Sequence, residues 1–452
     1  MVAGIFSIAV IAGFVIAVAP RAGWPITLVC AYVITLGGIT RPLYQPARET
    51  IHYGIASNTP GVTLGDILLV GALLSIWASG GRLKIGWLLA AFTLPAIVLL
   101  LTAWGNTPEQ WSGLKLYMTA LIAYGIGRWL SDNLTEQGTF ALACACFVVC
   151  LVQFVVTFAQ SQGIVLLPLA SDDSMRWIAE NRMVGLYNHP ATLGKTIFLL
   201  FCFLLPLSTY NRKTTRRVAY TAIALGSVAA LLTLSRANTF AIAVAIFLWV
   251  ILSGRATSAT KRFSTLVIAG LFAAANTDVV SALQIRQAQD PSGGFRDRIF
   301  ATGLEQIRSA PLTGTGPNYY SETVGQYDRF AATGYPLHNS ILYPSAELGI
   351  ALGLILFAPL LFTLLQSTRR VLWFKKMDAK SAALFSILPG FIAIAWTGWG
   401  MVATEILPLW FMGFGFLISK DGKGYSRTTE TLDRPAKTEP SKIQTRLHHP
   451  QA

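Results

Sequence analysis

Two polar segments of the chain, 161–190 and 281–340, carry arginine and no lysine, whereas the strongly basic segments 211–217, 254–262 and 368–376 use both cations. Arginine presents a planar fork that binds a phosphate through two hydrogen bonds and keeps its charge, whereas lysine is a mobile point charge. This usage predicts that the two arginine segments bind a phosphate or a diphosphate. Their arginines are Arg176, Arg182, Arg286, Arg296, Arg298, Arg308 and Arg329.

Each of these arginines has a second interpretation, an ion pair with an acidic residue of the same loop. This interpretation applies most to Arg286, Arg308 and Arg329. The candidate partners are Asp290, Asp297, Glu305, Glu322 and Asp328.

Arg236 stands apart because it lies between two apolar runs, in the sequence LLTLSRANTF, with almost no loop. An arginine at the edge of a membrane span is costly unless it has a partner or a function. Its long side chain can also reach water from a tight turn without any further function. We retain both interpretations, with Ser235 as a residue that could orient the guanidinium.

Histidine is scarce, and His338 occupies its most informative position, in LHNS, where 281–340 leads back into an apolar run. An imidazole with its usual pKa of about 6.5 is a proton acceptor at neutral pH, and Asn339 could orient a substrate hydroxyl. The structural alternative for His338 is a helix cap or a packing residue. His189, in YNHPATLG, precedes Pro190, and a proline at this place predicts a helix start.

The elements that position these residues are predicted to be membrane helices. The chain is 53% hydrophobic and 12% charged, with a mean hydropathy of +0.54, unlike a soluble domain. Apolar runs of bilayer-crossing length predict an all-α integral membrane protein with about 12–13 transmembrane helices. The predicted spans are 2–19, 25–40, 63–79, 85–104, 114–130, 139–160, 191–210, 218–235, 237–253, 263–280, 345–367, 381–403 and 406–419.

The net charge of +14 follows membrane topology and does not indicate nucleic-acid binding. The positive-inside rule assigns the basic segments to the cytoplasm, so that the two arginine segments face the opposite side. The side of the N-terminus is left open. The basic segments are 211–217, 254–262, 368–376 and the residues after Lys420.

These assignments divide the chain into a membrane bundle, residues 1–419, and a polar tail, 420–452. The composition of the tail cannot bury a core, so we predict a disordered cytoplasmic tail. Within the large loop, the apolar spacing in 297–309 predicts a short amphipathic helix. The Gly- and Pro-rich segment 311–318 predicts a turn that either connects or offers backbone N–H groups to an anion.

The five cysteines all lie inside apolar runs, where cysteine packs as a small hydrophobe. None has metal-site spacing with a histidine, and no acidic pair is placed to hold a divalent ion. The sequence therefore predicts neither a disulfide framework nor a metal site.

Four motifs, in chain order, resemble the O-antigen ligase and polymerase superfamily of bacterial membrane glycosyltransferases. They are NRMVGLYNHPATLG, LTLSRANTF, RDRIFATGLEQIRSAPLTGTGPNYY and LHNSILYPSAELGIALG. The resemblance covers roughly 180–360, and the N-terminal half is similar only in its hydropathy. The residues after Arg236, Ala-Asn, depart from the more usual glycine-containing continuation.

The resemblance implies a multi-pass protein of the bacterial inner membrane with a large periplasmic loop, a periplasmic active face and a cytoplasmic C-terminus. It implies transfer of a glycan from an undecaprenyl-diphosphate carrier to an acceptor hydroxyl, without metal, cofactor or nucleotide sugar. A ligase uses a lipid A-core sugar as the acceptor, whereas a polymerase uses a second carrier-linked repeat unit.

The resemblance also implies roles for individual residues. His338 and Asn339, from the H-N motif, accept the proton of the acceptor hydroxyl or orient it. Glu347 is similar to an acidic position in the segment that follows, and His189 supports the site. The implied diphosphate-binding residues are Arg182, Arg236, Arg296 and Arg298.

The alternative from a different class is a transporter, because a helix bundle with a cationic cavity could also carry a polysaccharide or a lipid across the membrane. Transporters place ionisable residues at mid-membrane, often with broken helices or inverted repeats. Here the residues of interest gather toward one face, and only Asp66 and Glu405 stand out within the spans. We therefore favour a ligase-like glycosyltransferase, with a polymerase as the alternative in the same class and a non-enzymatic scaffold as the third possibility.

Overall fold

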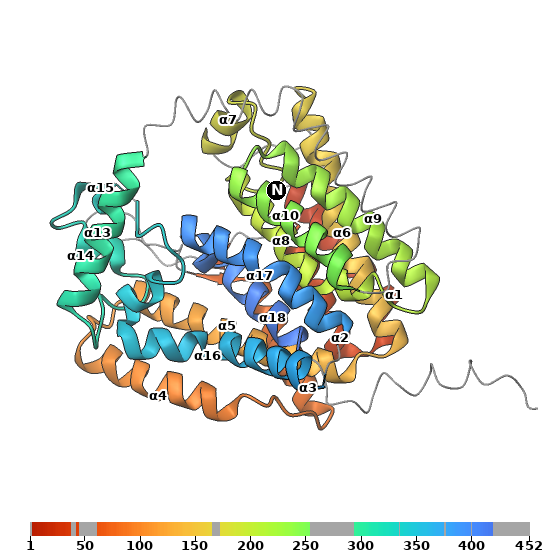
Figure 1. Ribbon diagram of the computed structural model, residues 1–452, viewed down its shortest axis with the longest axis horizontal. Helices are drawn as coiled ribbons and strands as arrows, with labels where there is room; N and C mark the ends of the chain where they lie inside the picture. Colours follow the sequence, from red (N-terminus) through yellow and green to blue (C-terminus); the bar gives the residue numbers. More distant parts are fainter. Residues whose placement is uncertain are drawn as a thin grey trace, which may run out of the picture. The chain divides into compact units, whose positions relative to one another are not determined.

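The computed structural model describes residues 2–37, 42–44, 61–164, 172–253, 293–333, 335–374, 377–398 and 400–418. These residues are almost entirely helical (Figure 1), apart from β1 (Pro42–Tyr44) and β2 (Val62–Thr63), which pair antiparallel. Within these described ranges, four helices are long and apolar enough to cross a membrane, and shorter apolar helices accompany them. The predicted all-α membrane fold is therefore confirmed.

The predicted spans overlap with helices wherever the structure describes them. The predicted span 263–280, Arg286 and the predicted tail 420–452 lie outside the described residues. The helices that overlap with predicted spans are α1 (Val2–Ala22), α2 (Trp24–Thr35), α3 (Leu64–Ala78), α4 (Gly86–Thr102), α5 (Pro108–Asn133), α6 (Glu136–Ser161), α8 (Pro190–Leu207), α9 (Lys213–Leu232), α10 (Arg236–Leu252), α16 (Tyr343–Phe374), α17 (Ala379–Thr397) and α18 (Ile406–Phe416).

Shorter helices occupy the arginine segments and the connection from α17 to α18. The predicted amphipathic helix is confirmed as α13, with its apolar side turned inward. The Phe300 ring of α13 lies 6.2 Å from the Trp396 ring of α17, and the Leu337 side chain packs against Gly303. These short helices are α7 (Asp172–Ala179), α13 (Gly293–Ser309), α14 (Tyr320–Val324), α15 (Arg329–Ala332) and the 3₁₀ helix η1 (Gly400–Val402).

The interior of the bundle depends on close backbone contact between α5 and α18. A Cβ atom at Gly127 would lie 2.0 Å from the Met412 carbonyl oxygen, and one at Gly415 would lie 2.2 Å from that of Tyr124. Small residues allow such approach between helices in an apolar medium. Because α18 is buried along its whole length, its first turn is held inside the protein, and the preceding Glu405 is partly buried.

Basic connections gather at one end of the bundle. Arg212, before α9, lies 3.6 Å from Glu136 at the start of α6, and Lys380 donates to the Ser131 hydroxyl near the end of α5 at 2.6 Å. These contacts bring the α5–α6, α8–α9 and α16–α17 connections together. We call the opposite end, where α8, α10 and α18 begin and α9 and α17 end, the site end.

α16 has a kink near its start, at Gly349, whose φ of 79° and ψ of 163° suit glycine alone. The predicted glycine-rich turn is seated beside this kink. There the N–H groups of Thr315 and Gly316 donate to the carbonyls of Ala346 and Glu347, at 3.0 and 2.8 Å. These N–H groups are therefore used within the protein, which favours the connector interpretation of the turn over anion binding.

Replacing Gly349 with alanine is expected to destabilise the protein by about 1–3 kcal/mol, because the backbone conformation is strained for any residue with a Cβ. The added Cβ would also lie 2.2 Å from the Leu312 carbonyl oxygen. Thermal unfolding of the purified protein measures the effect. The matched control is Gly13→Ala in α1, where a Cβ meets nothing within 4 Å; equal melting temperatures for the two variants would contradict the role of the kink.

Candidate functional site

His338 lies at the site end, in the loop between α15 and α16. Its Nδ1 atom is 2.7 Å from the Pro336 carbonyl oxygen. A carbonyl only accepts hydrogen bonds, so Nδ1 carries the proton and, in the neutral ring, Nε2 keeps a free lone pair. The exposed Tyr335 ring is stacked beside the imidazole, with 6.4 Å between ring centres. The loop thus fixes one tautomer of His338, with Nε2 as its basic atom.

The surroundings of His338 favour the neutral imidazole. Burial lowers the pKa of His338, the hydrogen bond to Pro336 opposes this shift, and the positive charges of Arg296 and Lys195 add to it. A neutral histidine at neutral pH can accept a proton from a hydroxyl group. The predicted role of His338 as a proton acceptor is compatible with this environment.

Asn339 has a structural task that the sequence analysis did not foresee. Its Oδ1 atom accepts hydrogen bonds from the N–H groups of Ile341 and Leu342, both at 3.0 Å, as a helix-capping residue does. Its buried Nδ2 atom has no hydrogen-bond partner among the described residues. The capping hydrogen bonds therefore use Oδ1 of Asn339, and Nδ2 is left for the predicted role of orienting a substrate hydroxyl.

Glu347 is buried behind the loop and holds two tyrosines. Its carboxylate accepts from the Tyr117 hydroxyl of α5 at 2.7 Å and from the Tyr343 hydroxyl at 2.6 Å. A buried carboxylate with such donors links helices rather than facing a substrate. We therefore interpret the predicted supporting role of Glu347 as a structural one, since it fixes the start of α16 and with it the His338 loop.

Arg182 and His189 lie around one aromatic ring. The Arg182 guanidinium is 4.4 Å from the centre of the Trp177 ring, and the His189 ring is 4.9 Å from it. His189 Nδ1 accepts from the Ala191 N–H at 3.0 Å and caps α8, whose predicted start at Pro190 is confirmed. Arg182 therefore lies near the first turn of α8, at the site end.

Arg236 is the first residue of α10 and lies at the same end. The preceding Ser235, which could orient the guanidinium, has another partner as well. Its hydroxyl accepts a hydrogen bond from Asn238 Nδ2 at 3.0 Å. The same amide donates to the Ala191 carbonyl at 3.0 Å. The start of α10 is thereby attached to the start of α8, which brings Arg236 and His189 to the same region.

The two arginines of α13 differ in their surroundings. Arg298 Nε lies 3.5 Å from Asp328, and its guanidinium is 5.2 Å from the Phe330 ring. The ion-pair interpretation is thus realised for Arg298. Arg296 is exposed, and its charge acts on His338. Of the two candidates for diphosphate binding, Arg296 is therefore the one positioned beside the histidine.

Lys195 was not singled out by the sequence analysis, although it is the lone cation of an apolar helix. Its side chain in α8 is only 9% exposed, and its charge acts on both Glu405 and His338. Its ammonium group packs against Gly400, where a Cβ atom would lie 2.1 Å from Nζ. A single lysine within an apolar run, directly after the HPATLG motif, was the signal available in the sequence.

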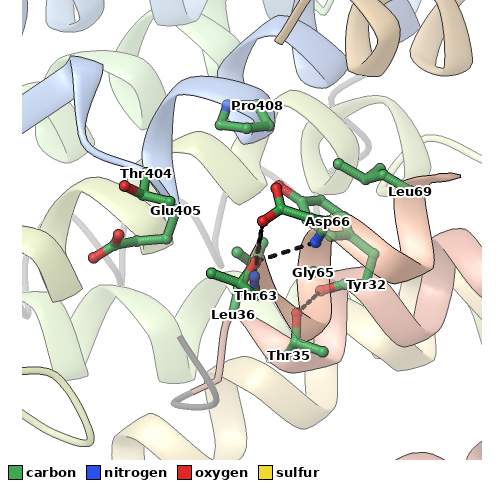
Figure 2. A pocket seen from close by; sticks show the side chains of 10 residues that line it. All are labelled: Tyr32, Thr35, Leu36, Thr63, Gly65, Asp66, Leu69, Thr404, Glu405 and Pro408. Carbon is green, nitrogen blue, oxygen red and sulfur yellow. Dashed lines mark hydrogen bonds between the residues drawn. The ribbon is translucent and has the colours of Figure 1, made fainter. Parts of the chain in front are cut away.

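A small cavity of about 20 Å³ lies beside Glu405, between the end of α2 and the starts of α3 and α18 (Figure 2). It has room for one water molecule and none for a sugar ring. Tyr32 Oη is buried there without a hydrogen-bond partner among the described residues. The Glu405 carboxylate points away from Asp66, so the two acidic residues do not form one acidic site in the cavity.

A family model described as O-antigen ligase matches residues 221–358. The match confirms the resemblance to the O-antigen ligase superfamily that the motifs indicated. It covers Arg236, Arg296, Arg298, His338 and Glu347, whereas the site residues of α8 and of the segment before it lie outside the matched range. No curated protein matches the chain.

The O-antigen ligase match supports a ligase- or polymerase-type function in general terms, with glycan or lipid-linked substrates. Together with the apolar helices, it indicates a multi-pass protein of a bacterial inner membrane. Of the residues at the site end, Arg236, Arg296 and His338 lie inside the range that the O-antigen ligase model matches.

Proposed function

We propose that the protein transfers a glycan from undecaprenyl diphosphate to an acceptor hydroxyl at the periplasmic face, as an O-antigen ligase with the lipid A-core as acceptor. The observation that carries this proposal is the O-antigen ligase match over 221–358. The matched range holds Arg236, Arg296 and His338, three residues whose chemistry this transfer requires.

Arg182, Arg236 and Arg296 bind the diphosphate in this proposal. Guanidinium groups suit a diphosphate because each offers a fork of donors and keeps its charge. Their fixed charges stabilise the negative charge that builds up on the leaving diphosphate. No metal ion is required for this step, because the arginines supply the positive charge. Arg298 contributes through its ion pair to the loop that holds Arg296.

His338 Nε2 accepts the proton of the acceptor hydroxyl as its oxygen attacks the anomeric carbon of the donor sugar. A new C–O bond forms, and the bond from that carbon to the diphosphate oxygen breaks, so that undecaprenyl diphosphate leaves with the electron pair. Attack from the face opposite the diphosphate inverts the anomeric configuration. General-base assistance of this kind contributes about 10²- to 10⁴-fold to a rate.

The rate of transfer is expected to depend on pH through His338. The base form is active, so the rate is constant above the pKa of His338 and falls as the pH drops through it. Since burial lowers this pKa below its usual value of about 6.5, more than half of the maximal rate should remain at pH 6.5. Initial rates between about pH 5 and 8 provide the measurement. A midpoint above about pH 7 would contradict the proposed environment of His338.

The proposal is tested by the surface glycan profile of a strain that lacks the protein. Loss of all long chains, with carrier-linked polymer accumulating, would support the ligase. Chains that shorten to one repeat unit on the acceptor, or loss of a secreted polymer, would indicate a polymerase instead. An unchanged profile would overturn glycan transfer and favour the transporter.

A further inference from the structure

Lys195 is a buried cation in a helix that otherwise fits a membrane span. α8 is long and apolar enough to cross a membrane, and Lys195 lies in its second turn. A charged side chain at such a place costs several kcal/mol unless a partner compensates it. Glu405, at the start of α18, supplies the opposite charge that acts on it.

The turn between α17 and α18 is shaped around this amine. A Cβ atom at Gly400 would lie 2.1 Å from Lys195 Nζ and 3.4 Å from its Cε. Even a methyl group at position 400 would therefore displace the ammonium group. Gly398 is the second glycine of the turn, and a Cβ there would lie 4.0 Å from Nζ.

The same turn holds the His338 loop. Ser340, two residues after His338, donates its hydroxyl to the Gly398 carbonyl at 2.5 Å. It accepts from the Met401 N–H at 3.3 Å, and its own N–H donates to the Ala395 carbonyl at 2.8 Å. A displacement of the turn is therefore transmitted directly to the backbone next to His338.

The charged groups around His338 come from two other elements. Arg296 of α13 and Lys195 of α8 both act on the imidazole as positive charges, and the Pro336 carbonyl binds its Nδ1–H. The Tyr335 ring lies beside the imidazole, with 6.4 Å between ring centres, and the negative charge of Glu405 acts on Lys195. Arg296 is exposed, whereas Lys195 is buried, so solvent screens the charge of Lys195 less.

We propose that Lys195 is a positioning residue of this site. Its ammonium group, packed against Gly400 and balanced by Glu405, fixes Gly398 and η1 (Gly400–Val402), which hold Ser340 and, through it, His338. The inference rests on the proposed function, in which His338 is the base. Lys195 also keeps a positive charge close to the imidazole, so that the neutral form of His338 prevails at neutral pH.

The test titrates His338 without requiring glycan transfer. Carbethoxylation of the His338-containing peptide, followed by mass spectrometry as a function of pH, gives the pKa of His338 in the full-length protein in membranes. In Lys195→Met, which removes the charge and keeps the volume, this pKa should rise, because one of the positive charges that act on the imidazole is lost. The control Lys115→Met removes another lysine of the site end, which lies 2.8 Å from Asp66, and should leave it unchanged.

Gly400→Ala provides an independent variant, because it displaces the amine without removing it. It should raise the pKa of His338 in the same direction and shift the acid limb of the transfer rate with it. An unchanged His338 titration in both Lys195→Met and Gly400→Ala would overturn the inference, as would an equal shift in Lys115→Met. A wild type that transfers no glycan, while its His338 titration still responds to Lys195, would refute the proposed function and support the coupling.

Discussion

Replacing His338 with alanine is expected to slow glycan transfer by about 10²- to 10⁴-fold, the range that a general base contributes. The variant removes the only atom proposed to accept the proton, Nε2, together with the hydrogen bond that Nδ1 makes with Pro336. Binding of the donor should persist, because the arginines that hold the diphosphate remain. The loss should therefore appear in kcat rather than in KM for the donor.

The transfer rate of His338→Ala is measured in membranes with the amount of protein matched to wild type. Tyr335→Phe is the control, since it keeps the ring beside the imidazole and changes no proposed proton acceptor. Full activity of His338→Ala at a normal protein level would show that His338 is not the base.

Replacing Arg236 with lysine is expected to slow transfer by about 10²- to 10³-fold, even though the charge is kept. Lysine lacks the planar fork that binds a phosphate through two hydrogen bonds. The Asn238 side chain, which attaches the start of α10 to α8, is unchanged in this variant. The variant thus separates the geometry of the guanidinium from its charge.

Arg329→Lys is the matched control for Arg236→Lys. Arg329 is exposed in α15 of the same outer segment and lies over the Phe330 ring at 5.0 Å. Its replacement should leave the transfer rate within about twofold, as for surface substitutions away from a site. Wild-type activity of Arg236→Lys would rule out two-point binding at this position, and a comparable loss in Arg329→Lys would indicate a general effect of arginine replacement.

The sequence predicted where the helices lie and which of their connections lie at the same end of the bundle. Both predictions use averages over whole segments, of hydropathy for the helices and of charge for the connections. Spans such as α6 and α17 follow from apolar length alone. The basic connections gather at one end, as the positive-inside rule predicts for residues such as Arg212. The side of the membrane that each end faces stays a prediction.

Contacts between distant parts of the chain could not be predicted in this way. The Arg298–Asp328 pair and the Tyr117–Glu347 hydrogen bond both depend on how loops and helices pack. Lys195 was not predicted as a site residue because one cation changes the mean hydropathy of a long apolar run very little. Its neighbour Gly400 is also about two hundred residues away in sequence. Only the fold reveals that the turn leaves space for its amine.

The central claim is that a glycosidic bond forms at this protein, and the most direct test uses purified protein in lipid nanodiscs. A labelled glycan on undecaprenyl diphosphate is offered with lipid A-core in one reaction and with a second carrier-linked unit in another. Our account predicts label on lipid A-core, release of undecaprenyl diphosphate and loss of both in His338→Ala. Label that stays on its carrier in both reactions, while the same protein in proteoliposomes moves the labelled lipid across the bilayer, would contradict it.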